Sequence, residues 1–378
     1  MKDWTEIQIK ELGRVVTGKT PPTSDRSFFD GSYRVVSPKD MDFDSRYIRN
    51  TLTTITQKAI EKFKNQVLPI DSIMFTSLSY GFGKIGITDT TSLTNQQINS
   101  IIVDEKNHDF NFVYYLLRHY KDRIFSYNAG IVTPIVPKSV FEKIKVFVPS
   151  NKKSEVKIAS ILSAYDDLIE NNLKRIKLLE EKAQLHYKEL IANSGKWDVV
   201  KLENFVSVVK GRKPANVLEQ PEEESQPYLL LETVERKKTH YTTDLSLPQS
   251  KITDVLMCMD GARSGLSFRG MDGAIGSTMA IWRSNSVNVS GEFLYQFMKQ
   301  NESAITQGNT GAAIPHANRK FILDMEIVLP PKNEANYFDE LTTPIIKLIN
   351  TLHNKNAKLR EARDILLPRL MNGQIEVS

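Results

Sequence analysis

The sequence predicts an α+β protein in which two similar globular α/β domains, related by pseudo-two-fold symmetry, are separated by an antiparallel coiled coil of two long helices. Two observations lead to this fold class. The second half of the chain repeats motifs of the first half in the same order, and each half closes with a long segment that carries apolar residues at heptad spacing. The 378 residues are enough for two domains, each with its own core. We expect globular domains at 1–152 and 196–333, a central long helix at 153–195, and a distal helix paired with it at 334–378.

The composition is that of an ordinary globular protein, with 40% hydrophobic and 25% charged residues. No apolar run reaches roughly 20 residues, the length of a membrane span, and MKDWTEIQ lacks the apolar core of a signal peptide. The single cysteine, Cys258, excludes an internal disulfide, and the six His residues show no metal-ligand spacing. We therefore expect a cytoplasmic protein without a membrane segment or a metal centre. The formal charge of +5 permits a polyanionic partner without requiring one.

The internal repeat rests on two offsets. An offset of 193 places VVTGKTP (15–21) on VVKGRKP (208–214). An offset of 181 relates FVYYLLRHY (112–120) to FLYQFMKQN (293–301), NAGIVTP (128–134) to NTGAAIP (309–315), and IKVFVP (144–149) to MEIVLP (325–330). DSIMF, from Asp71, resembles DVLMC, from Asp254, at a slightly different offset. Because the matches keep their order and nearly constant spacing, they indicate a duplicated domain.

The first copy of the turn also matches a phosphate-binding signature, G-x-x-x-x-G-K-[ST], at Gly13–Thr20. Such a loop needs a buried strand before it and a helix that starts at its Lys. Here Pro21 follows directly and disfavours helical backbone, and the preceding EIQIKEL alternates apolar and polar residues. The second copy has Val206 in place of Gly13 and Lys213 in place of Thr20. The pattern favours a glycine turn with cationic side chains, and a P-loop nucleotide hydrolase is the alternative.

The two heptad segments predict paired helices. In the first, Leu162, Ile169, Ile176, Ala183 and Leu190 recur every seven residues, interleaved with Ile158, Tyr165, Asn172, Leu179 and His186. In the second, Phe338, Ile345, Leu352, Leu359 and Leu366 are interleaved with Leu341, Leu348, Lys355, Ala362 and Arg369. The residues expected to make the pairing are Leu162, Ile169, Asn172, Ile176, Leu179, Ile345, Leu352 and Leu359.

Two features of these segments leave alternatives open. Asn172 either fixes the register by pairing with a polar group such as Lys355 or lies solvated on an imperfect seam. Pro344 implies a kink or a late start of the distal helix. Helices buried against their own domains are the alternative to pairing, but seams over four or more heptads favour pairing.

Polar, Gly-bearing loops of both copies supply side chains that suit base edges and phosphates. Asn and Gln amides match adenine N6 and N7, whereas Lys and Arg match guanine or phosphate. The alternative for each residue is an ordinary solvated turn. The candidate DNA-binding residues are Lys19, Thr20, Ser77, Ser79, Tyr80, Lys84, Asn95 and Gln96 in the first copy, and Arg212, Lys213, Arg263, Ser264, Arg269, Asn309, Thr310 and His316 in the second.

Over nearly its whole length the chain resembles the specificity subunits of type I restriction–modification systems. The resemblance is carried by the repeated G-K/R-x-P turn, by YGFGKIGI followed by NQQIN, by ILSAYDDLIENNLKRIKLLEEKAQ, and by the ending LREARDILLPRLMNGQI. It departs from the pattern where the second copy has IGSTMAI instead of NQQINSI.

This resemblance implies a non-catalytic subunit whose two domains each read one half of a split, asymmetric site on double-stranded DNA. The helix pair would be a spacer and a docking platform for two methyltransferase subunits, which translocating endonuclease subunits join. No cofactor is expected on this chain, because S-adenosylmethionine, ATP and Mg²⁺ would be bound by those partners, and no D-P-P-Y-type methyltransferase motif occurs in it. A coiled-coil scaffold without DNA contact remains an alternative, although it leaves the repeated blocks with basic loops unexplained.

Overall fold

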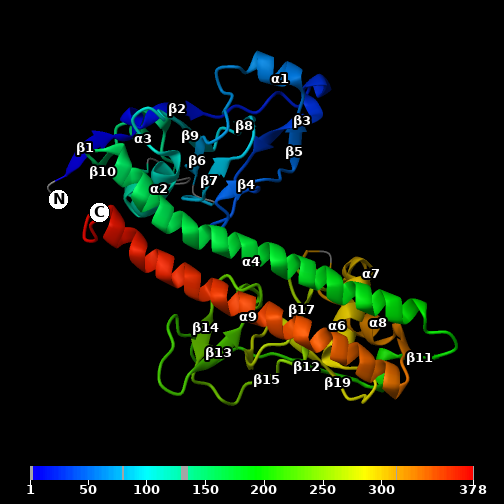
Figure 1. Ribbon diagram of the computed structural model, residues 1–378. Coiled ribbons are helices and arrows are strands. Elements are labelled where there is room, and N and C mark those ends of the chain that lie inside the picture. The colour runs from blue at the N-terminus through cyan, green and yellow to red at the C-terminus, as the bar shows by residue number, and fades with distance from the viewer. Residues whose placement is uncertain (1–2, 79–80, 129–134, 312, 378) are drawn as a thin grey trace. The chain divides into compact units, whose positions relative to one another are not determined.

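The computed structural model describes residues 3–78, 81–128, 135–311 and 313–377 (Figure 1). The chain divides into two compact units, Met1–Asn172 with Lys355–Ser378, and Leu173–Asn354. Each unit holds one globular block and one part of each long helix, α4 (Lys152–Ala192) and α9 (Lys332–Met371). Among the described residues, no helix is long and apolar enough to span a bilayer.

The first block is built on two main sheets and a strand pair. The larger sheet has the order β2-β9-β6-β7-β4, the smaller has the order β5-β3-β8, and β1 pairs with β10. The strands are β1 (Trp4–Gln8), β2 (Gly13–Thr17), β3 (Phe29–Val36), β4 (Tyr47–Ile48), β5 (Thr53–Ile55), β6 (Ile73–Thr76), β7 (Ile85–Thr88), β8 (Ser92–Thr94), β9 (Ile98–Val103) and β10 (Lys145–Pro149), and the helices are α1 (Gln57–Lys62), α2 (Phe110–Ser126) and α3 (Lys138–Phe141).

The second block has a corresponding arrangement. One sheet has the order β12-β19-β16-β17, another has the order β14-β13-β18-β15, and β11 pairs with β20. The strands are β11 (Asp198–Lys201), β12 (Val206–Lys210), β13 (Gln226–Leu229), β14 (His240–Thr242), β15 (Gln249–Ser250), β16 (Val255–Cys258), β17 (Ser267–Arg269), β18 (Gly273–Ile275), β19 (Met279–Ser284) and β20 (Glu326–Leu329), and the helices are α5 (Leu231–Val234), α6 (Gly291–Gln300), α7 (Glu302–Gln307) and α8 (Arg319–Leu323).

Strand order and register confirm the duplication. β2-β9-β6-β7 of the first block corresponds to β12-β19-β16-β17 of the second, with antiparallel pairing throughout. The match of DSIMF to DVLMC was wrong by one residue. Ile73 lies opposite Ile101, and Val255 lies opposite Trp282, so Ile73 corresponds to Val255 and not to Leu256. Short apolar runs look alike at neighbouring offsets, and only the pairing partner fixes the offset.

Each core takes in the end of the helix pair that lies in its own unit. In the first unit, Phe112 of α2 and Phe75 of β6 share a cluster with Leu162 of α4 and Leu370 of α9. In the second unit, Phe293 of α6 stacks edge-on between Tyr187 of α4 and Phe338 of α9, with ring centroids 5.0 and 5.5 Å apart. Burial of such large apolar side chains stabilises each block on its helices.

The two long helices pack together in an antiparallel manner, as predicted. Leu162, Ile169, Ile176 and Ala183 of α4 are all buried. In the second unit Ile176 and Ala183 form a cluster with Ile345, Ile349 and Leu352, against which Leu179 packs. Figure 1 shows α4 in green beside α9 in orange and red.

The second series proposed for the distal helix was wrong by one residue. Thr342, Ile349, Asn356 and Arg363 are buried, whereas Leu348 is 37% exposed and Lys355 is exposed. The second series of a heptad pattern can lie three or four residues after the first. Only packing against the facing helix decides which of these two positions is buried. Leu359 is partly buried.

The register pair is also different from the suggested one. The Asn172 amide donates to Oδ1 of Asn356 over 2.8 Å, and Lys355 is not its partner. Pro344 does not delay the helix, because α9 begins at Lys332 and continues through it, with Pro344 exposed. A proline on an exposed helix face loses one hydrogen bond without disturbing the packed face.

Replacing Asn172 by Leu is expected to lower the free energy of unfolding by about 1–3 kcal/mol, because Oδ1 of the buried Asn356 loses its donor. The double variant Asn172→Leu/Asn356→Leu should recover most of that loss, since two apolar side chains need no hydrogen bond. Denaturant titration of the three proteins measures both effects. A double variant as unstable as the single one would contradict the pairing.

Candidate DNA-recognition surfaces

The candidate loops of the first block meet at one end of the larger sheet. Strands β2 and β6 end there, and β7 and β9 begin there, because Thr17 lies opposite Asn99 and Thr76 lies opposite Ile98. Three parts of the chain that are far apart in the sequence, 18–22, 77–78 with 81–84, and 95–97, therefore come together. Antiparallel pairing produces this gathering, since each strand that ends at an edge is next to one that begins there.

Specific contacts hold these loops to one another. Thr20 Oγ1 donates to Gln96 Oε1 over 3.1 Å, Lys84 Nζ donates to the Pro38 carbonyl over 2.8 Å, and Ser77 Oγ donates to the Gln97 carbonyl over 3.0 Å. Lys19 and Gln96 are exposed, Thr20, Lys84 and Asn95 are half-buried, and Ser77 is buried. Ser77 thus stabilises the loops from the protein interior. Ser79 and Tyr80 lie outside the described residues.

The glycine shared by both turns permits close backbone approach. A Cβ on Gly18 would stand 2.2 Å from the Asn95 carbonyl oxygen, and one on Gly211 would stand 2.0 Å from that of Gly276. Either distance is far inside van der Waals contact, so only glycine fits. No helix follows Lys19 in 18–25, and β2 is an antiparallel edge strand. This geometry excludes a P-loop.

The second block gathers its loops at the equivalent end of its sheet. His316 Nδ1 bonds Asp260 Oδ1 over 2.7 Å, Asn309 Nδ2 donates to Ser264 Oγ over 2.8 Å, and the Gly261 N–H donates to the Pro315 carbonyl over 2.9 Å. The loop 260–264 is thereby joined to residues 309–311 and 313–316, with Thr310 and His316 exposed and Ser264 buried.

Cationic side chains surround these joined loops. Arg212 and Lys213 are exposed in the glycine turn, and Lys210 Nζ lies 3.7 Å from Asp260 Oδ2. Arg263 is exposed and pairs with Glu235. Asp260 and Glu235, which hold the cations, were not among the sequence candidates. Their partners lie up to 56 residues away, and no local motif marks them.

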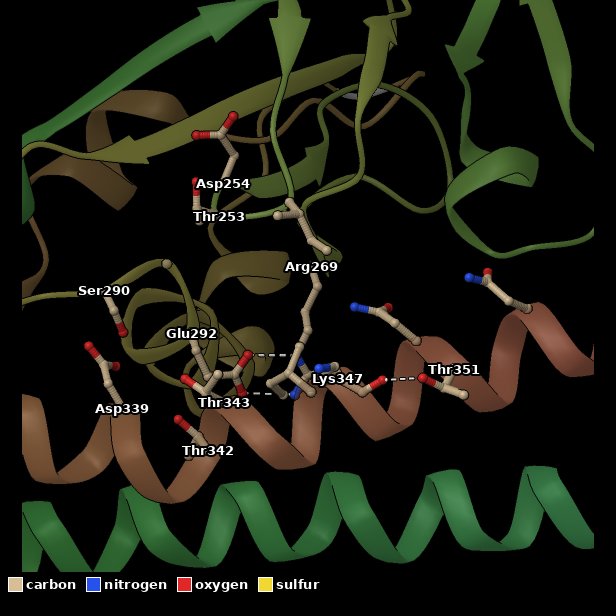
Figure 2. A pocket seen from close by; sticks show the side chains of 15 residues that line it. Thr253, Asp254, Arg269, Ser290, Glu292, Asp339, Thr342, Thr343, Lys347 and Thr351 are labelled. Atoms are coloured by element: carbon tan, nitrogen blue, oxygen red, sulfur yellow. Dashed lines mark hydrogen bonds and ion pairs between the residues drawn. The ribbon is translucent and has the colours of Figure 1, made fainter.

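Arg269 lies at the opposite end of its sheet from Arg263. It faces Val255 at the start of β16, whereas the candidate loop follows the end of β16. Its guanidinium donates to both oxygens of Glu292 over 2.6 and 2.8 Å (Figure 2). It also pairs with Glu180 of α4 and stacks 4.3 Å from the Tyr295 ring centroid. Burial opposes the charged form, but Glu292 and Glu180 raise the pKa of Arg269 above its ordinary value. These contacts place Arg269 in the joint between block and helices.

A groove of about 520 Å³ lies beside this joint (Figure 2). It runs between the start of α6, at Ser290, and the middle of α9, where Thr343 and Lys347 point into it. Asp254, at the base of β16, lines it too, so the groove is separate from the candidate DNA-contacting loops. Within the described part of the chain, no group of three or more His, Cys, Asp or Glu could hold a metal ion.

Known proteins match this architecture. The family model of the type I restriction modification DNA specificity domain matches residues 1–181, which cover the first block and most of α4. The chain is thus similar to the specificity subunits of type I restriction–modification systems.

Similar proteins match either the whole chain or about half of it. The type I restriction enzyme MjaIX specificity subunit of Methanocaldococcus jannaschii is 23% identical over 100% of this chain and 94% of its own length. The MjaVIII specificity subunit of the same organism is 27% identical over 46% of this chain and 41% of its own length. The crystal structure of a type I system S subunit from M. genitalium has the same fold, with a TM-score of 0.60 and 14% identity over 100% of this chain and 97% of that one.

Proposed function

We propose that this specificity subunit reads a two-part, asymmetric sequence of double-stranded DNA, one part with each globular block. As a member of its family it directs target recognition and is itself non-catalytic. The supporting observation is that equivalent loop ends carry different side chains in the two blocks. Thr20 corresponds to Lys213, and Gln96 corresponds to Ser277. Two blocks with the same sheet framework but different polar side chains on their loops are suited to recognise two different base sequences.

The proposed contacts divide by exposure and charge. The exposed cations Lys19, Arg212, Lys213 and Arg263 suit phosphate or guanine, whereas Gln96 suits a base edge. Ser77, Ser264 and Asn309 would act by holding the loops that carry these side chains.

We also propose the partners and the division of labour within the complex. A type I specificity subunit assembles with other subunits, and its family leaves the cofactors to the methyltransferase and endonuclease subunits. Two methyltransferase subunits would dock on the helix pair, and endonuclease subunits would join them, with S-adenosylmethionine, ATP and Mg²⁺ on those partners. Leu168, Leu178 and Leu185 of α4 are 53–64% exposed and are suited to such docking.

The domain boundaries and the location belong to the same proposal. Blocks 1–152 and 196–333 would each form a recognition domain, linked by helices in 153–195 and 334–378. The proposed location is the cytoplasm, where a subunit of this kind would meet DNA.

Mapping methylated positions in DNA from cells that express this chain with its methyltransferase tests the proposal. We expect modified adenines in one two-part motif with a fixed gap. Reversing the charges of Lys84 and Arg263 should weaken binding of that motif. Unchanged DNA binding would instead support a coiled-coil scaffold without DNA contact.

Inserting one heptad into α4 and one into α9 should lengthen the gap between the two half-sites. Seven helical residues add about 10 Å, equal to about three base pairs of duplex DNA. The same methylation mapping measures the gap. An unchanged gap in a folded, active complex would show that the helices do not set the spacing.

A further inference from the structure

The glycine turn at Gly18–Thr20, whose sequence matches the phosphate-loop pattern, contacts the loop that carries Gln96. Gly18 allows the backbone of this turn to approach Asn95 closely, and the Gly18 N–H donates to the Ile98 carbonyl over 3.2 Å. Two residues further on, the Thr20 hydroxyl donates to Oε1 of Gln96 over 3.1 Å. The turn therefore fixes the position of one glutamine amide.

The backbone beneath that glutamine is also fixed. Asn95 Oδ1 accepts from the Gln97 N–H over 3.1 Å, and Asn95 Nδ2 donates to Gln97 Oε1 over 3.2 Å. The Asn95 N–H donates to the Val36 carbonyl over 2.9 Å. Gln96 is the exposed residue at the tip of this braced turn. A side chain held in one orientation loses less conformational entropy on binding.

The remaining hydrogen-bonding positions of the Gln96 amide match adenine. Thr20 occupies one lone pair of Oε1, which leaves a second lone pair and both Nε2 hydrogens. In the major groove adenine offers an N6 donor beside an N7 acceptor, whereas guanine offers two acceptors there. An amide bridges the adenine pair and leaves an unsatisfied contact against guanine.

The second block does not have this pair of a threonine and a glutamine. Ser277 stands at the position of Gln96, and Lys213 stands at the position of Thr20. We infer that Gln96, oriented by Thr20, reads an adenine in the half-site of the first block and that the second block has no equivalent amide. This inference rests on the proposed function and adds the base and the residue that reads it. Gln96 touches the base, and Thr20 is a positioning residue.

A double-mutant cycle on protein and DNA tests the inference. The full chain is assembled with its methyltransferase, and binding to the mapped duplex is measured at constant salt. Each adenine is replaced in turn by 7-deazaadenine, which lacks the N7 acceptor. Wild type should lose about 10-fold in affinity at one adenine of one half-site. Gln96→Ala should bind the natural duplex about 10-fold more weakly and lose nothing further at that adenine.

Two matched variants separate base reading from structure. Thr20→Val should weaken binding a few-fold while the same adenine stays sensitive to 7-deazaadenine, and Thr20→Ser should restore wild-type affinity. Gln57→Ala, an exposed glutamine on α1, should change neither quantity.

The outcomes are distinct for the inference and for the function on which it rests. If the losses from Gln96→Ala and 7-deazaadenine multiply at every adenine, Gln96 does not read an adenine, although the subunit still recognises DNA. If wild type binds the mapped and a scrambled duplex equally, the proposed function itself fails.

Discussion

Replacing Arg363 with Ala is expected to destabilise the first unit by about 3–5 kcal/mol. Arg363 of α9 is 1% exposed and pairs with Asp166 of α4, whose second oxygen accepts from the Tyr115 hydroxyl of α2. Removing the guanidinium leaves a buried carboxylate without its countercharge. Because the three residues come from both long helices and from the block, unfolding in denaturant should be affected throughout the unit.

Two controls separate the lost charge pair from general damage to α9. Lys358→Ala removes an exposed cation from the same helix and should change the free energy of unfolding by less than about 0.5 kcal/mol. The triple variant Asp166→Leu/Arg363→Met/Tyr115→Phe replaces the three buried partners by apolar groups, leaves the exposed Asp364 that also pairs with Arg363, and should recover much of the stability. A stable Arg363→Ala protein would mean that water or another cation reaches Asp166.

Arg269→Ala should have a comparable cost in the second unit, about 3–5 kcal/mol, without altering the salt dependence of DNA binding. Its side chain is 15% exposed and neutralises Glu292 and Glu180, with side chains 11% and 34% exposed. Without the guanidinium, both carboxylates would lie beside Tyr295 without the charge of Arg269 to neutralise them. The measurement is denaturant titration together with DNA affinity at several salt concentrations.

Arg263→Ala provides the contrast. Arg263 has a side chain 50% exposed and a single ion pair with Glu235, so its loss should cost less than about 1 kcal/mol of stability. On the proposed function, the slope of log affinity against log salt should fall by about 0.9, the value for one phosphate contact. If Arg269→Ala lowers the slope and Arg263→Ala does not, the assignment of the two arginines must be exchanged.

The different locations of Arg263 and Arg269 in the fold could not be predicted from the sequence segment that contains both. In MDGARSGLSFRG they are six residues apart and equally cationic. Strand β17 intervenes, however, and carries Arg269 to the far end of the sheet, where acidic residues from α4 and α6 meet it. Asp260 and Glu235 were missed for the same reason, since their partners are brought to them by strand pairing.

The sequence by itself determined the duplication, the two long helices and the resemblance to type I specificity subunits, because repeat offsets and heptads are patterns along the chain that can be recognised in a single sequence. Only the tertiary structure decided that Asn172 meets Asn356, that Ile73 corresponds to Val255, and which polar residues share one loop surface. The physical reason is that a periodic pattern fixes which face of an element is apolar but not its register against a neighbour. Register is set by side chains of both partners at once.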